Sequence, residues 1–274
     1  MPRDPKNIWR VPAYLPYVQP PLTDEAVREA ERKIGFKLPE EYLALLRIQN
    51  GGYIRYTLED ICQEKIRGIG PHYPSLTGSV WEDHDREYVS FELDGLVPID
   101  GDGHWHLCLD YRKNKEHPTI THADFEGDDE WPVADSFADY LAMLKPDCNK
   151  TDFFIPNVED FEALKGALSS QLGVEFEVPS TQGNGYPIHR ARAGTKKDPE
   201  WIWLSPNLVQ RGFIRESEGT REDLQEAFSG LTSRYPEIPD SSIVVDVTEG
   251  VRGKVMDACK RLNIDLRPLG EYFV

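Results

Sequence analysis

The sequence predicts an α+β protein with two domains. Three observations support this prediction: a length of 274 residues, two helix patterns followed by short strand patterns and a closing helix, and a second alternation of helices and strands after Pro146. Single hydrophobic cores stop growing near this length, and domains of about 100–150 residues are commonest. We therefore expect an arm at residues 1–22, a domain at 23–146 with a mostly antiparallel sheet flanked by helices, and a smaller α+β domain at 150–274.

The arm and the first helix come before the sheet. Residues 1–22 contain six prolines together with several aromatic residues, so we expect an irregular segment that lies on the domain surface. Thr23 is a suitable N-cap for a helix with apolar residues at helical spacing, and Gly35 is a suitable stop.

A second helix is predicted over residues 39–49, before a sharp stop. Pro39 suits the first helical position, and the two glutamates after it face the positive end of the helix macrodipole. Tyr42 lies on the apolar face of this helix. The run Asn50-Gly51-Gly52 tolerates positive φ, so we expect a positive φ at Gly51 or Gly52.

Short apolar runs then predict the strands of the first domain. These lie at residues 54–58, 88–91, 96–99, 104–110 and 119–122. In the fourth run Trp105, Leu107 and Leu109 alternate with polar residues, which predicts one apolar and one polar face. Residues 124–131 predict an acidic loop, and the stripe beginning at Phe137 predicts a helix ended by Pro146.

The second region predicts further helices and strands. Asn157 is expected to cap a helix that Gly173 ends. Strands are predicted at 174–178, 186–193, 201–204, 243–247 and 264–266, and helices at 220–231 and 251–262. The region contains no second copy of the pattern around residues 38–52, and its motifs do not indicate a family.

Three motifs in the first region, taken in order, resemble the SUKH superfamily. They are the segment from Leu38-Pro39 through Tyr42 to Asn50-Gly51-Gly52, the strand that contains Trp105 and ends near Asp110, and the closing helix after Ser136. SUKH domains are the fungal cell-wall-assembly-regulator (Smi/Knr) type and are abundant in bacteria. The resemblance covers roughly residues 20–146. It implies that the motif residues are primarily structural, namely Leu38, Pro39, Tyr42, Asn50, Gly51, Gly52, Trp105 and Asp110.

The resemblance also implies a function. Bacterial SUKH domains are typically immunity proteins, which bind and neutralise the toxic domain of a cognate polymorphic toxin, often a nuclease. We therefore expect a non-enzymatic protein-binding module whose partner is a protein toxin. A regulatory scaffold that binds several partners weakly, as in the fungal relatives, is an alternative.

The charge distribution indicates the same kind of partner. The net charge is −17, and residues 82–139 hold 17 of the 48 acidic residues against four basic ones. Such a surface repels phosphate backbones and anionic lipids but attracts basic proteins. We expect a basic protein partner, with no nucleic acid and no membrane as partners, whereas the oligomeric state is not indicated.

The expected partner-binding residues lie in and near the acidic loop. They are Asp102, His104, Asp124, Glu126, Asp128, Asp129, Glu130 and Trp131. Exposed carboxylates would accelerate encounter with a basic partner, and Trp131 is the candidate for a buried anchor. The alternative for Trp131 is inward packing against the closing helix.

Catalytic and metal sites are weakly indicated. His104 and His106 at i, i+2 would be a workable pair of metal ligands in a metal-dependent enzyme, but no third ligand can be named, and a polar sheet face is the preferred interpretation. No nucleophile motif is present, so we expect no catalytic residue and no cofactor. Four widely spaced cysteines predict buried free thiols. The N-terminus lacks a secretory signal, and no segment is long enough to span a bilayer, so the expected location is the cytosol.

Overall fold

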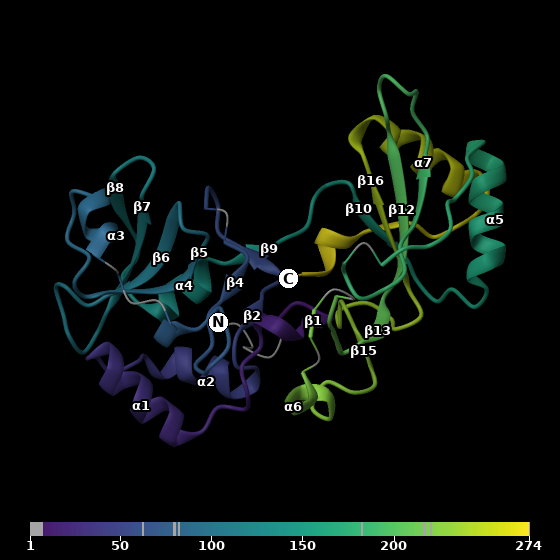
Figure 1. Ribbon diagram of the computed structural model, residues 1–274. Helices are drawn as coiled ribbons and strands as arrows, with labels where there is room; N and C mark the ends of the chain where they lie inside the picture. Colours follow the sequence, from purple (N-terminus) through teal and green to yellow (C-terminus); the bar gives the residue numbers. More distant parts are fainter. Residues whose placement is uncertain are drawn as a thin grey trace. The chain divides into compact units, whose positions relative to one another are not determined.

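The computed structural model describes residues 8–61, 63–78, 81, 83–181, 183–215, 218–219 and 221–273 (Figure 1). The chain forms two compact units. The first runs to Lys145 and includes the short segment Arg221–Leu224, and the second takes up the remaining residues from Pro146. Both units combine helices with antiparallel strands, which confirms the predicted α+β class.

Two helices open the first unit. In α1 (Asp24–Ile34) the Thr23 side chain accepts a hydrogen bond from the Ala26 N–H, and Gly35 ends the helix with a φ of 81°. Helix α2 (Glu40–Ile48) follows, with Pro39 at the N-cap, one position before its expected place. The two helices bury Val27 and Ala30 of α1 and Tyr42, Leu43, Leu45 and Leu46 of α2.

The turn after α2 is held by two glycines with positive φ and by hydrogen bonds of the Asn50 side chain. Gly51 and Gly52 have φ values of 90° and 127°, which confirms the predicted positive φ. The buried Asn50 side chain donates to the carbonyl oxygens of Pro20 and Ile69 at 2.6 and 2.9 Å and accepts from the Ile69 N–H at 2.8 Å. One amide therefore ties three segments of the chain together.

A four-stranded antiparallel sheet forms the centre of the first unit. Its order is β5-β6-β7-β8, with bounds Leu96–Gly101, Trp105–Asp110, Thr119–Asp124 and Asp129–Ala134. One face packs on α1, α2 and α4 (Phe137–Met143) through core residues such as Ile99, Leu107 and Leu109.

The opposite face of this sheet is also covered. Cys108 and Ala123 pack there against Leu93 and Phe125, so the predicted polar face is wrong. The strand predicted at 88–91 is wrong as well, because Tyr88 ends helix α3 (Asp83–Tyr88) and the next residues are not in a strand. The predicted acidic loop is a hairpin, since residues 129–134 form the edge strand β8.

Part of the arm belongs to the core. Ile8 and Trp9 are 4% and 5% exposed and belong to the main hydrophobic cluster, so the expected surface position is wrong for them. Trp9 forms a β-bridge with Ile54. Residues 1–7 lie outside the described residues.

The second unit is built on a five-stranded antiparallel sheet. Its order is β11-β12-β16-β10-β17, with bounds His189–Arg192, Trp201–Pro206, Ile243–Val247, Asp152–Ile155 and Arg267–Pro268. Helices α5 (Phe161–Leu172) and α7 (Glu249–Arg261) pack on one face through Leu168, Val251 and Val255. Figure 1 shows these helices beside β10, β12 and β16.

Several predictions for the second unit need correction. The α5 N-cap is Asp160 and not Asn157, because the Asp160 carboxylate accepts the Ala163 N–H at 2.9 Å. Residues 174–178 form only a bridge at Phe176, and residues 264–266 precede the last strand. The helix predicted at 220–231 is limited to α6 (Glu222–Gln225), and β15 (Leu231–Ser233) follows it. Strand β10 was not predicted.

Shorter elements complete the two units. They are β1 (Ala13–Tyr14), β2 (Gly52–Tyr53), β3 (Tyr56–Thr57), β4 (Lys65–Ile66), β9 (Lys145–Pro146), β13 (Leu208–Gln210), β14 (Gly212–Phe213) and 3-10 turns at Leu15–Tyr17, Leu76–Gly78 and Leu269–Tyr272. Cys108 and Cys259 are buried free thiols, Cys148 is half-buried, and Cys62 lies outside the described residues. Among the described helices, none has both the length and the apolar character needed to cross a membrane.

Candidate protein-binding surface

Two turns meet at one end of the first sheet. They are residues 102–104, between β5 and β6, and residues 125–128, between β7 and β8. The Phe125 N–H donates to the His104 carbonyl oxygen at 2.8 Å, and His104 Nδ1 lies 2.8 Å from a Glu126 carboxylate oxygen. The structure thus brings Asp102, His104, Asp124 and Glu126 together from two hairpins.

Three carboxylates at this end hold the backbone of the turns. Asp102 accepts the N–H groups of His104 and Trp105 at 2.9 and 3.3 Å. Partial burial favours the neutral acid, but these donors outweigh it, and the pKa of Asp102 is lowered. Asp124 accepts the Gly127 N–H at 3.0 Å, and Asp128 accepts the Ser90 N–H at 2.6 Å. These side chains shape the surface more than they present free charge.

Glu130 belongs to a separate network on the opposite sheet face. Arg112 contacts Glu130 at 2.8 Å and Asp110 at 2.7 Å, and the Thr121 hydroxyl donates to Asp110 at 2.9 Å. Burial raises the pKa of the Asp110 carboxyl, yet the hydrogen bonds from Arg112 and Thr121 prevail and lower it. Asp110 is therefore held by buried hydrogen bonds, and Glu130 shares the Arg112 cation with it.

Trp131 ends a stack of three aromatic rings. Trp105 and His122 have ring centroids 5.5 Å apart at an interplanar angle of 12°, and His122 and Trp131 are 4.1 Å apart at 18°. The Trp131 side chain is 39% exposed. Trp131 thus stacks on the neighbouring strand and keeps a large part of its side chain exposed.

Together these observations define the acidic hairpin surface: His104, Asp124, Glu126, Asp129 and Trp131. Asp129 and Glu126 are exposed, and Asp124 is half-buried. The sequence indicated all five residues. It missed His122, which is the cross-strand partner of Trp131 on β8 and stacks on Trp105 of β6 from the diagonal position.

The two candidate metal ligands have different environments. His104 is exposed and paired with Glu126, whereas His106 is buried edge-on against the rings of Trp81 and Phe125, with centroids 5.0 Å away in each case. Among the described residues, no group of three His, Cys, Asp or Glu side chains is placed to hold a metal ion. A third ligand for this pair is therefore not found in that part of the chain.

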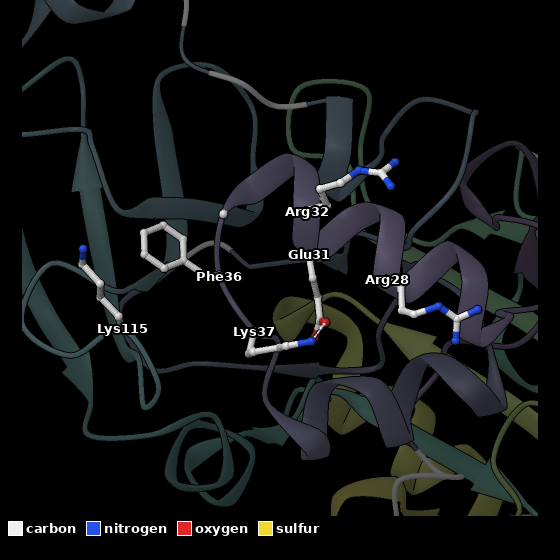
Figure 2. A pocket seen from close by; sticks show the side chains of 7 residues that line it. Arg28, Glu31, Arg32, Phe36, Lys37 and Lys115 are labelled. Carbon is white, nitrogen blue, oxygen red and sulfur yellow. Dashed lines mark hydrogen bonds and ion pairs between the residues drawn. The ribbon is translucent and has the colours of Figure 1, made fainter.

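A pocket of about 490 Å³ beside α1 has a basic lining that the sequence did not indicate. Figure 2 shows Lys37 directed to Glu31, at 2.5 Å, and the guanidinium groups of Arg28 and Arg32 directed away from Lys115. Phe36 in the pocket stacks on Tyr111 at 4.3 Å. Because the cations do not converge, this geometry does not define a site for one anion.

Comparison with protein families identifies the N-terminal region. Residues 21–143 match the SMI1 / KNR4 family (SUKH-1), which confirms the resemblance predicted from the motifs. The match covers less than half of the 274 residues and leaves the second unit unassigned. The first unit therefore carries a Smi1/Knr4-type module. A search of curated proteins found no match.

Proposed function

We propose that this protein is a non-enzymatic binding module that neutralises a cognate protein toxin in the cytosol by covering its toxic domain. The family match supports a module that binds another protein. The toxin is basic, and a nuclease fits best, because an enzyme that binds phosphate backbones carries positive charge that an acidic surface complements.

The gathering of exposed groups on the acidic hairpin surface is the observation that carries this proposal. Glu126 and Asp129 are exposed carboxylates on one hairpin, and Trp131 exposes 39% of its surface beside them. Charges of this kind accelerate encounter with a basic partner. An aromatic side chain at the same place supplies the apolar contact that slows dissociation.

Purification of the full chain from its native cell tests the proposal. At about 0.05 M salt we expect one basic protein to co-purify in stoichiometric amount, and less of it above about 0.5 M, where screening is short-ranged. A Glu126→Gln, Asp129→Asn variant should retain less partner than a Glu25→Gln, Glu29→Gln variant with the same charge change on α1. Several weakly bound partners would support a regulatory scaffold instead, and an acidic partner would contradict the proposal.

A further inference from the structure

The aromatic stack of the first sheet ends in an open ring face. Trp105, His122 and Trp131 lie on β6, β7 and β8, with nearly parallel rings, so the stack runs across the strands. Within the described residues β8 is the last strand of this sheet. One face of the Trp131 indole is covered by His122, and the other therefore faces the sheet edge.

His122 is an unpartnered polar group within the stack. It is 7% exposed, and its Nδ1 atom finds no hydrogen-bond partner among the described residues. Burial lowers the pKa of the imidazole, with Asp124 acting in the opposite direction, which favours the neutral ring. A neutral ring beneath Trp131 does not repel a cation that approaches the open face.

Two carboxylates lie on the same sheet face as the stack. The register pairs Asp124 with Asp129 and His122 with Trp131, which places the aspartates two residues from His122 and Trp131, at about 7 Å along the strands. Asp124 is also the cross-strand partner of Trp105. Asp129 is exposed, and Asp124 is half-buried. One oxygen of each accepts a backbone N–H, that of Glu130 for Asp129 at 2.8 Å and that of Gly127 for Asp124 at 3.0 Å, so each keeps a second oxygen for a ligand. An open indole and two carboxylates are thus neighbours.

The sheet edge itself is poorly suited to accept another strand. Pro132 lies in the middle of β8 and has no N–H to donate. Prolines on edge strands protect sheets against strand addition. The edge therefore favours contact through a side chain of the partner.

We propose that this site binds an arginine side chain of the partner protein, with the guanidinium stacked on the outer face of Trp131 and hydrogen-bonded to Asp129 and Asp124. The inference rests on the proposed function and deepens it by naming the group that is recognised. A planar guanidinium continues a stack of flat rings and presents donors to both carboxylates. A lysine ammonium is more strongly hydrated and offers a point charge only.

Two short peptides that differ only in Arg or Lys test the inference on the full chain. We use acetylated Gly-Arg-Gly-Arg-Gly amide and its lysine counterpart, and follow the Trp131 indole N–H by NMR, with Trp131→Phe to assign the signal. The arginine peptide should shift this signal, with an apparent affinity at least about five times that of the lysine peptide. Asp129→Asn should weaken the arginine peptide several-fold, whereas Asp257→Asn, an exposed aspartate of the second unit, should not change it.

An unperturbed Trp131 signal would overturn the inference, and so would equal responses to the two peptides, which would mean binding by charge alone. The outcome for the proposed function is read separately from co-purification. If a native partner binds but the Trp131 signal does not respond to it, only the proposed arginine site is refuted. If no protein partner co-purifies, the proposed function itself is refuted.

Discussion

Gly51 is fixed by two independent constraints at the scale of single residues. Its φ is 90°, and an added Cβ would lie 2.5 Å from the Gly68 backbone nitrogen. Gly35 has a similar φ of 81°, but its added Cβ would meet no atom within 4 Å. We predict that Gly51→Ala lowers the free energy of unfolding by at least about 2 kcal/mol more than Gly35→Ala, in denaturant titrations. Equal losses would mean that close approach to Gly68 is unimportant.

His106 should make the first unit sensitive to acid. Burial, and then repulsion from Arg67, lowers its pKa from 6.5 to about 4. The unfolded chain therefore binds more protons between these values, and stability falls as the pH falls through this window. We predict that His106→Gln removes up to about 3 kcal/mol of the difference in unfolding free energy between pH 7 and pH 4. An unchanged pH dependence in the variant would contradict this account.

The sequence predicts which residues lie at the candidate site, but it does not predict which of them are engaged in hydrogen bonds or ion pairs. The acidic residues and Trp131 are evident in the sequence, because their density and type do not depend on the fold. Which of these carboxylates are engaged by other groups of the protein, however, depends on the fold. Asp128 is bound by the Ser90 N–H and Glu130 by Arg112, partners 38 and 18 residues away. No local pattern identifies such pairs.

At the scale of elements, the helices with capping residues were the most predictable. Thr23 with Gly35 bounds α1, and Gly51 with Gly52 follows α2, because these signals act within a few residues. Strand β8 was missed, since acidic residues and Pro132 oppose strand formation locally. Its partner β7 supplies the hydrogen bonds that hold it, and this contribution is tertiary.

The Arg112 network should hold β6, β7 and β8 together. Asp110 is 5% exposed and is bound by Arg112, so loss of the arginine leaves a buried carboxylate without its cation. We predict that Arg112→Met lowers the free energy of unfolding by about 3 kcal/mol. Arg86→Met, which removes an exposed pair with Asp94, should cost less than about 1 kcal/mol. Similar losses in thermal or denaturant unfolding would show that the network contributes little.

At the scale of the whole molecule, the first unit contains a segment from far along the chain. Arg221 is 8% exposed and donates to the carbonyl oxygens of Leu15 and Val18 at 3.0 and 2.8 Å. The sequence predicted a continuous helix there, because contacts across some 200 positions leave no local pattern. The hydrophobic periodicity of the long elements, in contrast, was enough to predict the class of both units.

Arg221 should therefore stabilise the first unit. We predict that Arg221→Met lowers hydrogen-exchange protection around Leu15 and Val18 by an amount equivalent to about 1–3 kcal/mol. Arg267→Met, which removes an exposed pair with Asp265, serves as the control and should leave that protection unchanged. Equal protection in the Arg221 variant and the wild type would show that the segment is dispensable.

The association rate with the native partner, measured as a function of salt, tests the central claim most directly. For the wild type we expect the rate to fall steeply as salt rises through about 0.15 M, because exposed charges are screened beyond about 8 Å. The Glu126→Gln, Asp129→Asn variant should associate more slowly at low salt and show a shallower salt dependence. The Glu25→Gln, Glu29→Gln variant should behave like the wild type. A rate that is independent of salt and unchanged in the hairpin variant would contradict binding through the acidic hairpin surface.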